Sequence, residues 1–148
     1  MEEDIKFMGE ALKQAQKAYK IREVPIGAVI VKDNKIIAKG FNKKEKKQDV
    51  TKHAEIIAIQ KASKKLKNWR LNDCTLYVTL KPCNMCVGAI NQSRIKRVVV
   101  GTEYESKGAT ESHGVGNCEF GEKIDVTTGI MEKECREIIQ NFFKERRI

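Results

Sequence analysis

A chain of 148 residues, 41% of them hydrophobic, is long enough to bury one core, and we expect a single domain over residues 1–148. No stretch is apolar for long enough to cross a bilayer, which excludes a membrane-spanning protein, and the first residues carry no charged-then-apolar leader. With five cysteines, an odd number, we expect a cytoplasmic protein whose thiols stay reduced. The formal net charge of +9 fits a nucleic-acid partner and a solvated Lys-rich surface about equally well.

The first half of the chain predicts two helices and a hairpin. Apolar residues recur at three- and four-residue spacing over residues 5–19, which predicts an amphipathic helix that ends before Pro25. Two β-branched runs, residues 25–31 and 35–41, flank the turn sequence KDN and predict a β-hairpin. After a Lys-rich loop, residues 53–66 present a broad apolar face, which favours a second helix.

The second half alternates strands with helices. The predicted elements are a strand at 74–80, a helix at 84–93, a strand at 96–101, a short edge strand at 124–128 and a C-terminal helix at 130–148. The segment 102–123 is glycine-rich and aperiodic, so we expect a long loop of the kind that is functional or mobile. This alternation predicts an α/β sandwich around one sheet.

Two short motifs point to a metal site. Cys83 and Cys86 are three residues apart in the first turn of a helix that Pro82 opens, where the helix N-terminus stabilises thiolates and prepares them for a soft cation. Alone, the pair could equally be a redox couple or two small buried residues. His53 and Glu55 are two residues apart, so both can face one site only at the first turn of their helix.

Together with His53, the two cysteines supply three ligands for zinc and leave the fourth tetrahedral position open to water, the pattern of a catalytic zinc. A structural zinc would need a fourth ligand, for which the sequence offers Cys74, Cys118, Cys135 and His113. Of these, Cys118 and His113 share the glycine-rich segment and stay open as alternatives. The other two are expected to be small buried residues.

His-Ala-Glu followed by Pro-Cys-x-x-Cys is the signature of zinc nucleobase deaminases. The chain resembles the bacterial tRNA-specific adenosine deaminases more specifically, in the segments REVPIGAVIV, FN, HAEIIAI, NWRL, TLYVTL, PCNMCVGAI, SRIKRVVVG and NFFKERR. Members of that family convert the wobble adenosine of a tRNA anticodon to inosine and work as homodimers. The resemblance implies a three-layer α/β/α cytidine-deaminase-like fold, with helices on both faces of a five-stranded mixed sheet. It also implies one zinc ion (Zn2+) per subunit and the tRNA anticodon stem-loop as partner.

The resemblance also assigns roles to residues. Glu55, which is not needed as a ligand, would move protons from the activated water to the base and to the departing ammonia. The substrate-binding residues implied by the family are Asn42, Ile26, Pro25, Leu80 and Ala54. The implied RNA contacts are Arg146, Arg147, Phe143 and Lys107.

Three departures bear on the substrate. Lys81 stands where the family commonly has Glu, Tyr104 where it commonly has a small polar residue, and the region after Ala109 lacks the usual longer apolar segment. A deaminase of a free purine or pyrimidine base or nucleoside is therefore the alternative function. A non-catalytic zinc-binding RNA module is a third, against which Glu55 counts because binding needs no proton shuttle.

Overall fold

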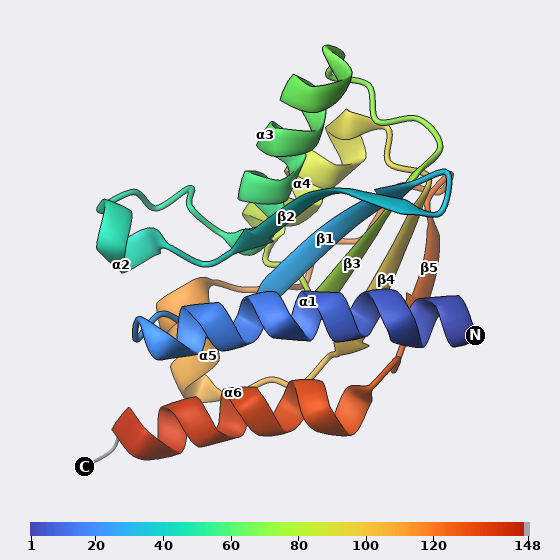
Figure 1. The fold of residues 1–148 in the computed structure, drawn as a ribbon. Coiled ribbons are helices and arrows are strands. Elements are labelled where there is room, and N and C mark those ends of the chain that lie inside the picture. The colour runs from blue at the N-terminus through green and yellow to red at the C-terminus, as the bar shows by residue number, and fades with distance from the viewer. Residues whose placement is uncertain (147–148) are drawn as a thin grey trace.

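The computed structural model describes residues 1–146. These residues form six helices and five strands (Figure 1), in the order α1 (Glu2–Lys20), β1 (Gly27–Lys32), β2 (Lys35–Phe41), α2 (Lys44–Lys47), α3 (Ala54–Leu66), β3 (Cys74–Leu80), α4 (Asn84–Ser93), β4 (Arg97–Thr102), α5 (Lys107–His113), β5 (Asp125–Thr128) and α6 (Glu132–Arg146). Over residues 1–146, no helix combines the length and the apolar composition that a bilayer crossing needs.

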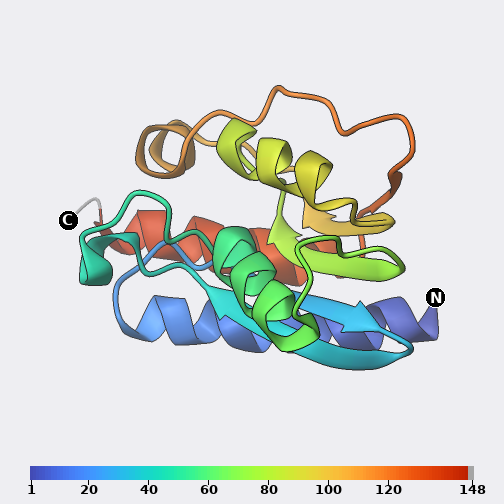
Figure 2. The same ribbon diagram turned by 90° about the horizontal axis from the view of Figure 1, so that it is seen from above.

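The strands form one mixed sheet in the order β2-β1-β3-β4-β5. β1 runs antiparallel to both β2 and β3, whereas β3, β4 and β5 are parallel. Helices α3 and α4 cover one face of the sheet, and α1 and α6 cover the other (Figure 1). Figure 2 shows the small helices α2 and α5 at the end of the molecule where α3 and α4 begin. This end of the sheet contains the predicted site.

The core lies on both faces of the sheet because strand side chains alternate between them. On β1, Ile30 belongs to a cluster that includes Ala58 of α3. Its neighbour Val29 belongs to a second cluster that includes Met8 of α1. These four side chains (Ile30, Ala58, Val29 and Met8) are fully buried. Strand β1 therefore packs against a helix on each face of the sheet.

The predicted helices and strands are all present, and the KDN turn closes the hairpin with two left-handed residues, Asp33 and Asn34. The expectation of a structureless segment over 102–123 was wrong, because the segment contains α5. This helix has only seven residues, too few for a clear period, and it begins where the Ser106 hydroxyl accepts a hydrogen bond from the Ala109 N–H at 3.0 Å. The Lys-rich loop likewise contains the single-turn α2.

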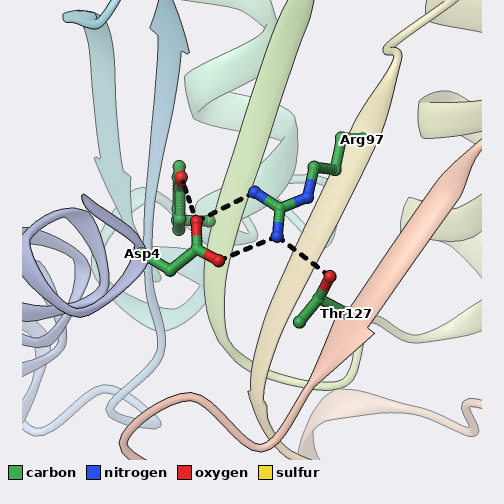
Figure 3. A network of polar contacts seen from close by, with 4 residues as sticks. Asp4, Arg97 and Thr127 are labelled. Atoms are coloured by element: carbon green, nitrogen blue, oxygen red, sulfur yellow. Dashed lines mark hydrogen bonds and ion pairs between the residues drawn. The ribbon is translucent and has the colours of Figure 1, made fainter. Parts of the chain in front are cut away.

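Asp4 fastens the first turn of α1 to the sheet (Figure 3). Its two carboxylate oxygens each accept a hydrogen bond from Arg97 of β4 at 2.8 Å, and Oδ1 also accepts one from the Tyr77 hydroxyl of β3 at 2.7 Å. Arg97 donates in addition to Thr127 of β5 at 3.0 Å. The paired guanidinium keeps the pKa of Asp4 below its usual value, with the Tyr77 hydroxyl adding to the effect. The network joins one helix to three strands.

We expect Asp4→Asn to lower the free energy of unfolding by on the order of 2–3 kcal/mol at neutral pH, because Arg97 loses its charged partner. Since the pKa of Asp4 is lower in the folded than in the unfolded chain, this stabilisation is complete above the ordinary value of 3.8 and is lost as the pH falls below it. Urea unfolding at several pH values measures both effects. Glu10→Gln, at an exposed ion pair with Lys13 on the same helix, is the control and should cost far less. Equal losses from the two variants would contradict this role of Asp4.

Candidate active site

The two sequence motifs meet because each lies at the start of a helix. His53 and Cys83 are the residues directly before α3 and α4, and both have extended backbone conformations. Glu55 then lies in the first turn of α3, and Cys86 in the first turn of α4. The four side chains thus come from the starts of two helices, two from the residue before the helix and two from its first turn. Both helix N-termini point their partial positive charge at this site, which favours anionic side chains there.

The spacing of the donor atoms suits a tetrahedral metal ion. His53 Nδ1 lies 3.5 Å from Cys83 Sγ and 3.5 Å from Cys86 Sγ. Zinc–nitrogen and zinc–sulfur bonds at a tetrahedral angle place two ligand atoms about 3.6 Å apart. The distances from His53 to the two cysteines match this value. His53, Cys83 and Cys86 are all buried, as a site closed to bulk water requires.

The protonation states agree with a cation site. A hydrogen bond from Cys86, supported by His53, lowers the pKa of Cys83 to about 4. The pKa of the Cys86 thiol is raised, chiefly by its hydrogen bond to the Cys83 thiolate and by burial, so the pair holds one proton without a metal. Burial raises the pKa of Glu55 to about 7. Both Glu55 carboxylate oxygens are buried without a hydrogen-bond partner, which leaves them free for a bound water or substrate.

Asn42 links the end of β2 to the start of α3. Its side-chain Oδ1 accepts a hydrogen bond from the Ala54 backbone N–H at 2.7 Å, and its backbone N–H donates to the Ile26 carbonyl at 3.3 Å. Gly40 allows this close approach, since a Cβ there would lie 2.4 Å from the Ala54 carbonyl oxygen. Pro25 is buried beside this junction, as are Asn42, Ala54 and Ile26. The structure therefore brings four of the predicted substrate-binding residues together next to His53.

His113 reaches the same place from α5, which the sequence analysis had treated as part of a loop. Its ring stacks on the His53 ring with centroids 4.0 Å apart and planes 22° apart. Its Nδ1 lies 3.3 Å from Asn42 Nδ2, whereas its Nε2 is buried without a partner. Burial, with His53 and Lys44 nearby, lowers the pKa of His113 well below its usual value, so the ring is neutral. The sequence signal that could have predicted this helix was the N-capping Ser106 followed by Ala109 and His113, which are four residues apart and both buried.

The four candidates for an additional ligand differ in burial and in their distance from the site. Cys74 and Cys135 are fully buried, as expected. Cys118 is exposed and belongs to no metal-compatible group within residues 1–146, so the structure does not support it as a ligand. The donor atoms of His113, His53 and Cys83 lie within 4.8 Å of one another, which makes His113 the one of the four that the fold carries to the site.

The remaining predicted residues are Leu80 and the four implied RNA contacts. Leu80 is buried and shares a pocket with Lys81 and His113, whereas Arg146 shares a second pocket with Asn42. The implied RNA contacts are distributed unevenly, with Lys107 and Arg146 exposed, Phe143 half-buried against Gly108 of α5, and Arg147 outside the described residues.

The half-buried Lys81 does not introduce an isolated positive charge. Two acidic residues, Glu103 and Glu105, line the same pocket, with Tyr104 between them. The backbone N–H of Lys81 donates to the Thr102 carbonyl at 2.9 Å, which sets this pocket where β3 and β4 end. Lys81 and Tyr104, the two residues that the sequence analysis singled out for their bearing on the substrate, therefore lie in one pocket beside the predicted base site.

The fold and the buried His, Glu and Cys group define a deaminase, and the family model of MafB19-like deaminases matches residues 2–147. The tRNA-specific adenosine deaminase of Streptococcus pyogenes serotype M18 is 40% identical over 149 residues, covering 99% of this chain and 94% of that protein. The corresponding protein of Haemophilus influenzae is 44% identical over 97% of this chain and 85% of its own length. The chain belongs to the family of tRNA-specific adenosine deaminases.

Solved structures agree with this assignment. A structure from studies of A-to-I editing by tRNA:A34 deaminases superposes with a TM-score of 0.77 at 42% identity, over 89% of this chain and 97% of that one. A guanine deaminase from Nitrosomonas europaea superposes with a TM-score of 0.76, over 92% of this chain and 82% of that one, but at 23% identity it shows the shared fold alone. The predicted fold class, a five-stranded mixed sheet in a three-layer cytidine-deaminase-like fold, is confirmed.

Proposed function

We propose that this protein is a zinc-dependent hydrolase that deaminates the wobble adenosine of a tRNA anticodon to inosine. The observation that carries the proposal is the buried group of His53, Cys83, Cys86 and the unpartnered Glu55, in a chain about 40% identical over nearly its whole length to proteins named for this activity. Water and adenosine are the reactants, and inosine and ammonia the products.

His53, Cys83 and Cys86 would hold the zinc. When bound, zinc supplies Lewis-acid activation of a water molecule. Glu55 takes the proton of that water, passes it to N1 of the adenine ring and assists the departure of ammonia. A carboxyl whose pKa lies near 7 suits this task, because it can both accept and release a proton at neutral pH.

Asn42 orients the base. Its Oδ1 is committed to the Ala54 N–H, which fixes the direction of the amide and leaves Nδ2 facing the site. In that orientation Nδ2 is a donor for a ring nitrogen or oxygen of the base. Ile26, Pro25 and Leu80 would form the apolar surroundings of the flipped base.

The RNA backbone would meet basic residues around the entrance. Arg146 borders the pocket that contains Asn42, and Lys107 opens α5 on the exposed side. We propose these two, with Arg147 and Phe143, as contacts to the anticodon stem-loop. A homodimer in the cytoplasm, where tRNA is processed, is the corresponding proposal for assembly and location.

The test is to incubate the zinc-loaded protein with an anticodon stem-loop that carries a wobble adenosine and to measure inosine by nuclease digestion and mass spectrometry. We expect inosine, and we expect RNA binding to weaken steeply as salt rises because phosphates provide much of the affinity. Ammonia released from free adenine, guanine or cytosine, with no inosine in the RNA, would favour the free-base alternative. In that case, the pocket lined by Lys81 and Tyr104 would be the feature of this chain that accounts for the different substrate.

A further inference from the structure

The side chain of His113 occupies the space against one face of the His53 ring. The His113 ring lies nearly parallel to the His53 ring at 4.0 Å, and its Nδ1 lies 3.3 Å from Asn42 Nδ2. A flipped nucleobase is held by these same two kinds of contact, stacking of its face and a hydrogen bond at its edge. His113 is only 7% exposed, so its ring lies inside the site beside His53 and Asn42.

We infer that His113 is an internal occupant of the base-binding position and that α5 must carry it away before an RNA base can enter. The inference rests on the proposed function, since it identifies the position beside Asn42 and His53 as that of the base. It goes beyond that function by adding a closed state that competes with the substrate.

The closed position of α5 depends on few contacts. Lys44 Nζ donates to the Ser112 carbonyl at 2.5 Å, and the Asn84 N–H donates to the Val115 carbonyl at 2.7 Å. Gly114, between these two carbonyls, has φ +115°, a conformation that side chains other than glycine rarely adopt. Only Ala109 and His113 of α5 are buried, and the other residues of the helix are exposed or half-buried. The helix can therefore leave the site without disturbing the sheet.

If only the open state binds RNA, the apparent affinity equals the affinity of the open state multiplied by the fraction of molecules in that state. One stacking contact and one hydrogen bond, partly replaced by water in the open state, favour the closed state by about tenfold. Removing the imidazole should thus tighten RNA binding. An ordinary RNA contact at this position would have the opposite effect, so the sign of the change separates the two roles.

The experiment uses the zinc-loaded protein in a Glu55→Gln background, which prevents turnover. We expect His113→Ala to bind the wobble-adenosine stem-loop about tenfold more tightly, measured by fluorescence anisotropy. Zinc transfer to a chromophoric chelator should also become faster, because the site is open more often. Thr110→Ala, which also truncates a side chain of α5 to alanine but on the exposed side, is the control and should change neither quantity.

A second variant leaves the His113 side chain in place. Lys44→Met removes the hydrogen bond to the Ser112 carbonyl that holds α5 and should likewise accelerate zinc transfer. Unchanged zinc transfer in both His113→Ala and Lys44→Met would overturn the inference, as would weaker RNA binding by His113→Ala. Faster zinc transfer in a protein that binds no RNA in any variant would instead support closure by His113 and reject tRNA as the substrate.

Discussion

Glu55→Gln is expected to reduce deamination by at least about 10²–10⁴-fold, the contribution of a positioned general acid and base. Gln keeps the shape of the side chain but cannot take a proton from water or give one to the base. Single-turnover formation of inosine measures the loss. Because Glu55 is placed outside the ligand set, the variant should retain one zinc per chain, which elemental analysis of the purified protein checks.

The same substitution separates chemistry from folding. Burial raises the pKa of Glu55 to about 7 in the metal-free fold, above its ordinary value of 4.5, so stability falls as the pH rises between these values. Glutamine carries no charge, and metal-free Glu55→Gln should therefore be more stable than the metal-free parent at and above pH 7. A variant that loses activity together with stability and zinc would show that Glu55 acts mainly in the structure, contrary to its proposed role.

Loss of a zinc ligand is the second large effect that we expect. Cys86 is fully buried and lies 3.5 Å from His53 Nδ1, so Cys86→Ala leaves only two of the three proposed ligands. Zinc content should fall well below one per chain, and activity should fall by more than about a hundredfold, because the water is no longer activated. Removing zinc from the unchanged protein with a chelator should have the same effect, and adding zinc back should restore activity.

Two other cysteines provide the controls. Cys118→Ser alters an exposed thiol and should leave zinc content and activity unchanged. Cys74→Ala alters a buried thiol at the start of β3, and it should reduce stability but not zinc content. Loss of zinc from Cys118→Ser would indicate a fourth protein ligand and hence a structural site, which is the outcome that contradicts a catalytic zinc.

The pocket of Lys81 concerns the substrate and not the chemistry. The positive charge of Lys81 is accompanied by Glu103 and Glu105 in the same pocket, which Leu80 and His113 also line. The ligands and Glu55 lie at the starts of α3 and α4, whereas this pocket lies where β3 and β4 end. Substrate preference can therefore differ between members of this fold while the zinc and proton-transfer residues stay the same.

The sequence by itself was sufficient to predict the five strands, the four longer helices and a candidate metal site. Periods of two and of three to four residues identified the strands and the longer helices, since burial on a sheet or along a helix repeats at those intervals. The two motifs identified His53, Glu55, Cys83 and Cys86, because the spacing within each motif is possible for one site only at the first turn of a helix. Both inferences depend on residues close together in the chain.

Only the tertiary structure placed His113. Its stacking on His53 and its contact with Asn42 join residues 60 and 71 positions apart, and no local pattern specifies such contacts. Helix α5 is too short for a readable period, and it is held by contacts with Lys44, Asn84 and Phe143 from three other parts of the chain. Local spacing thus predicted which groups do the chemistry, whereas long-range packing decided which side chain lies against His53 and Asn42.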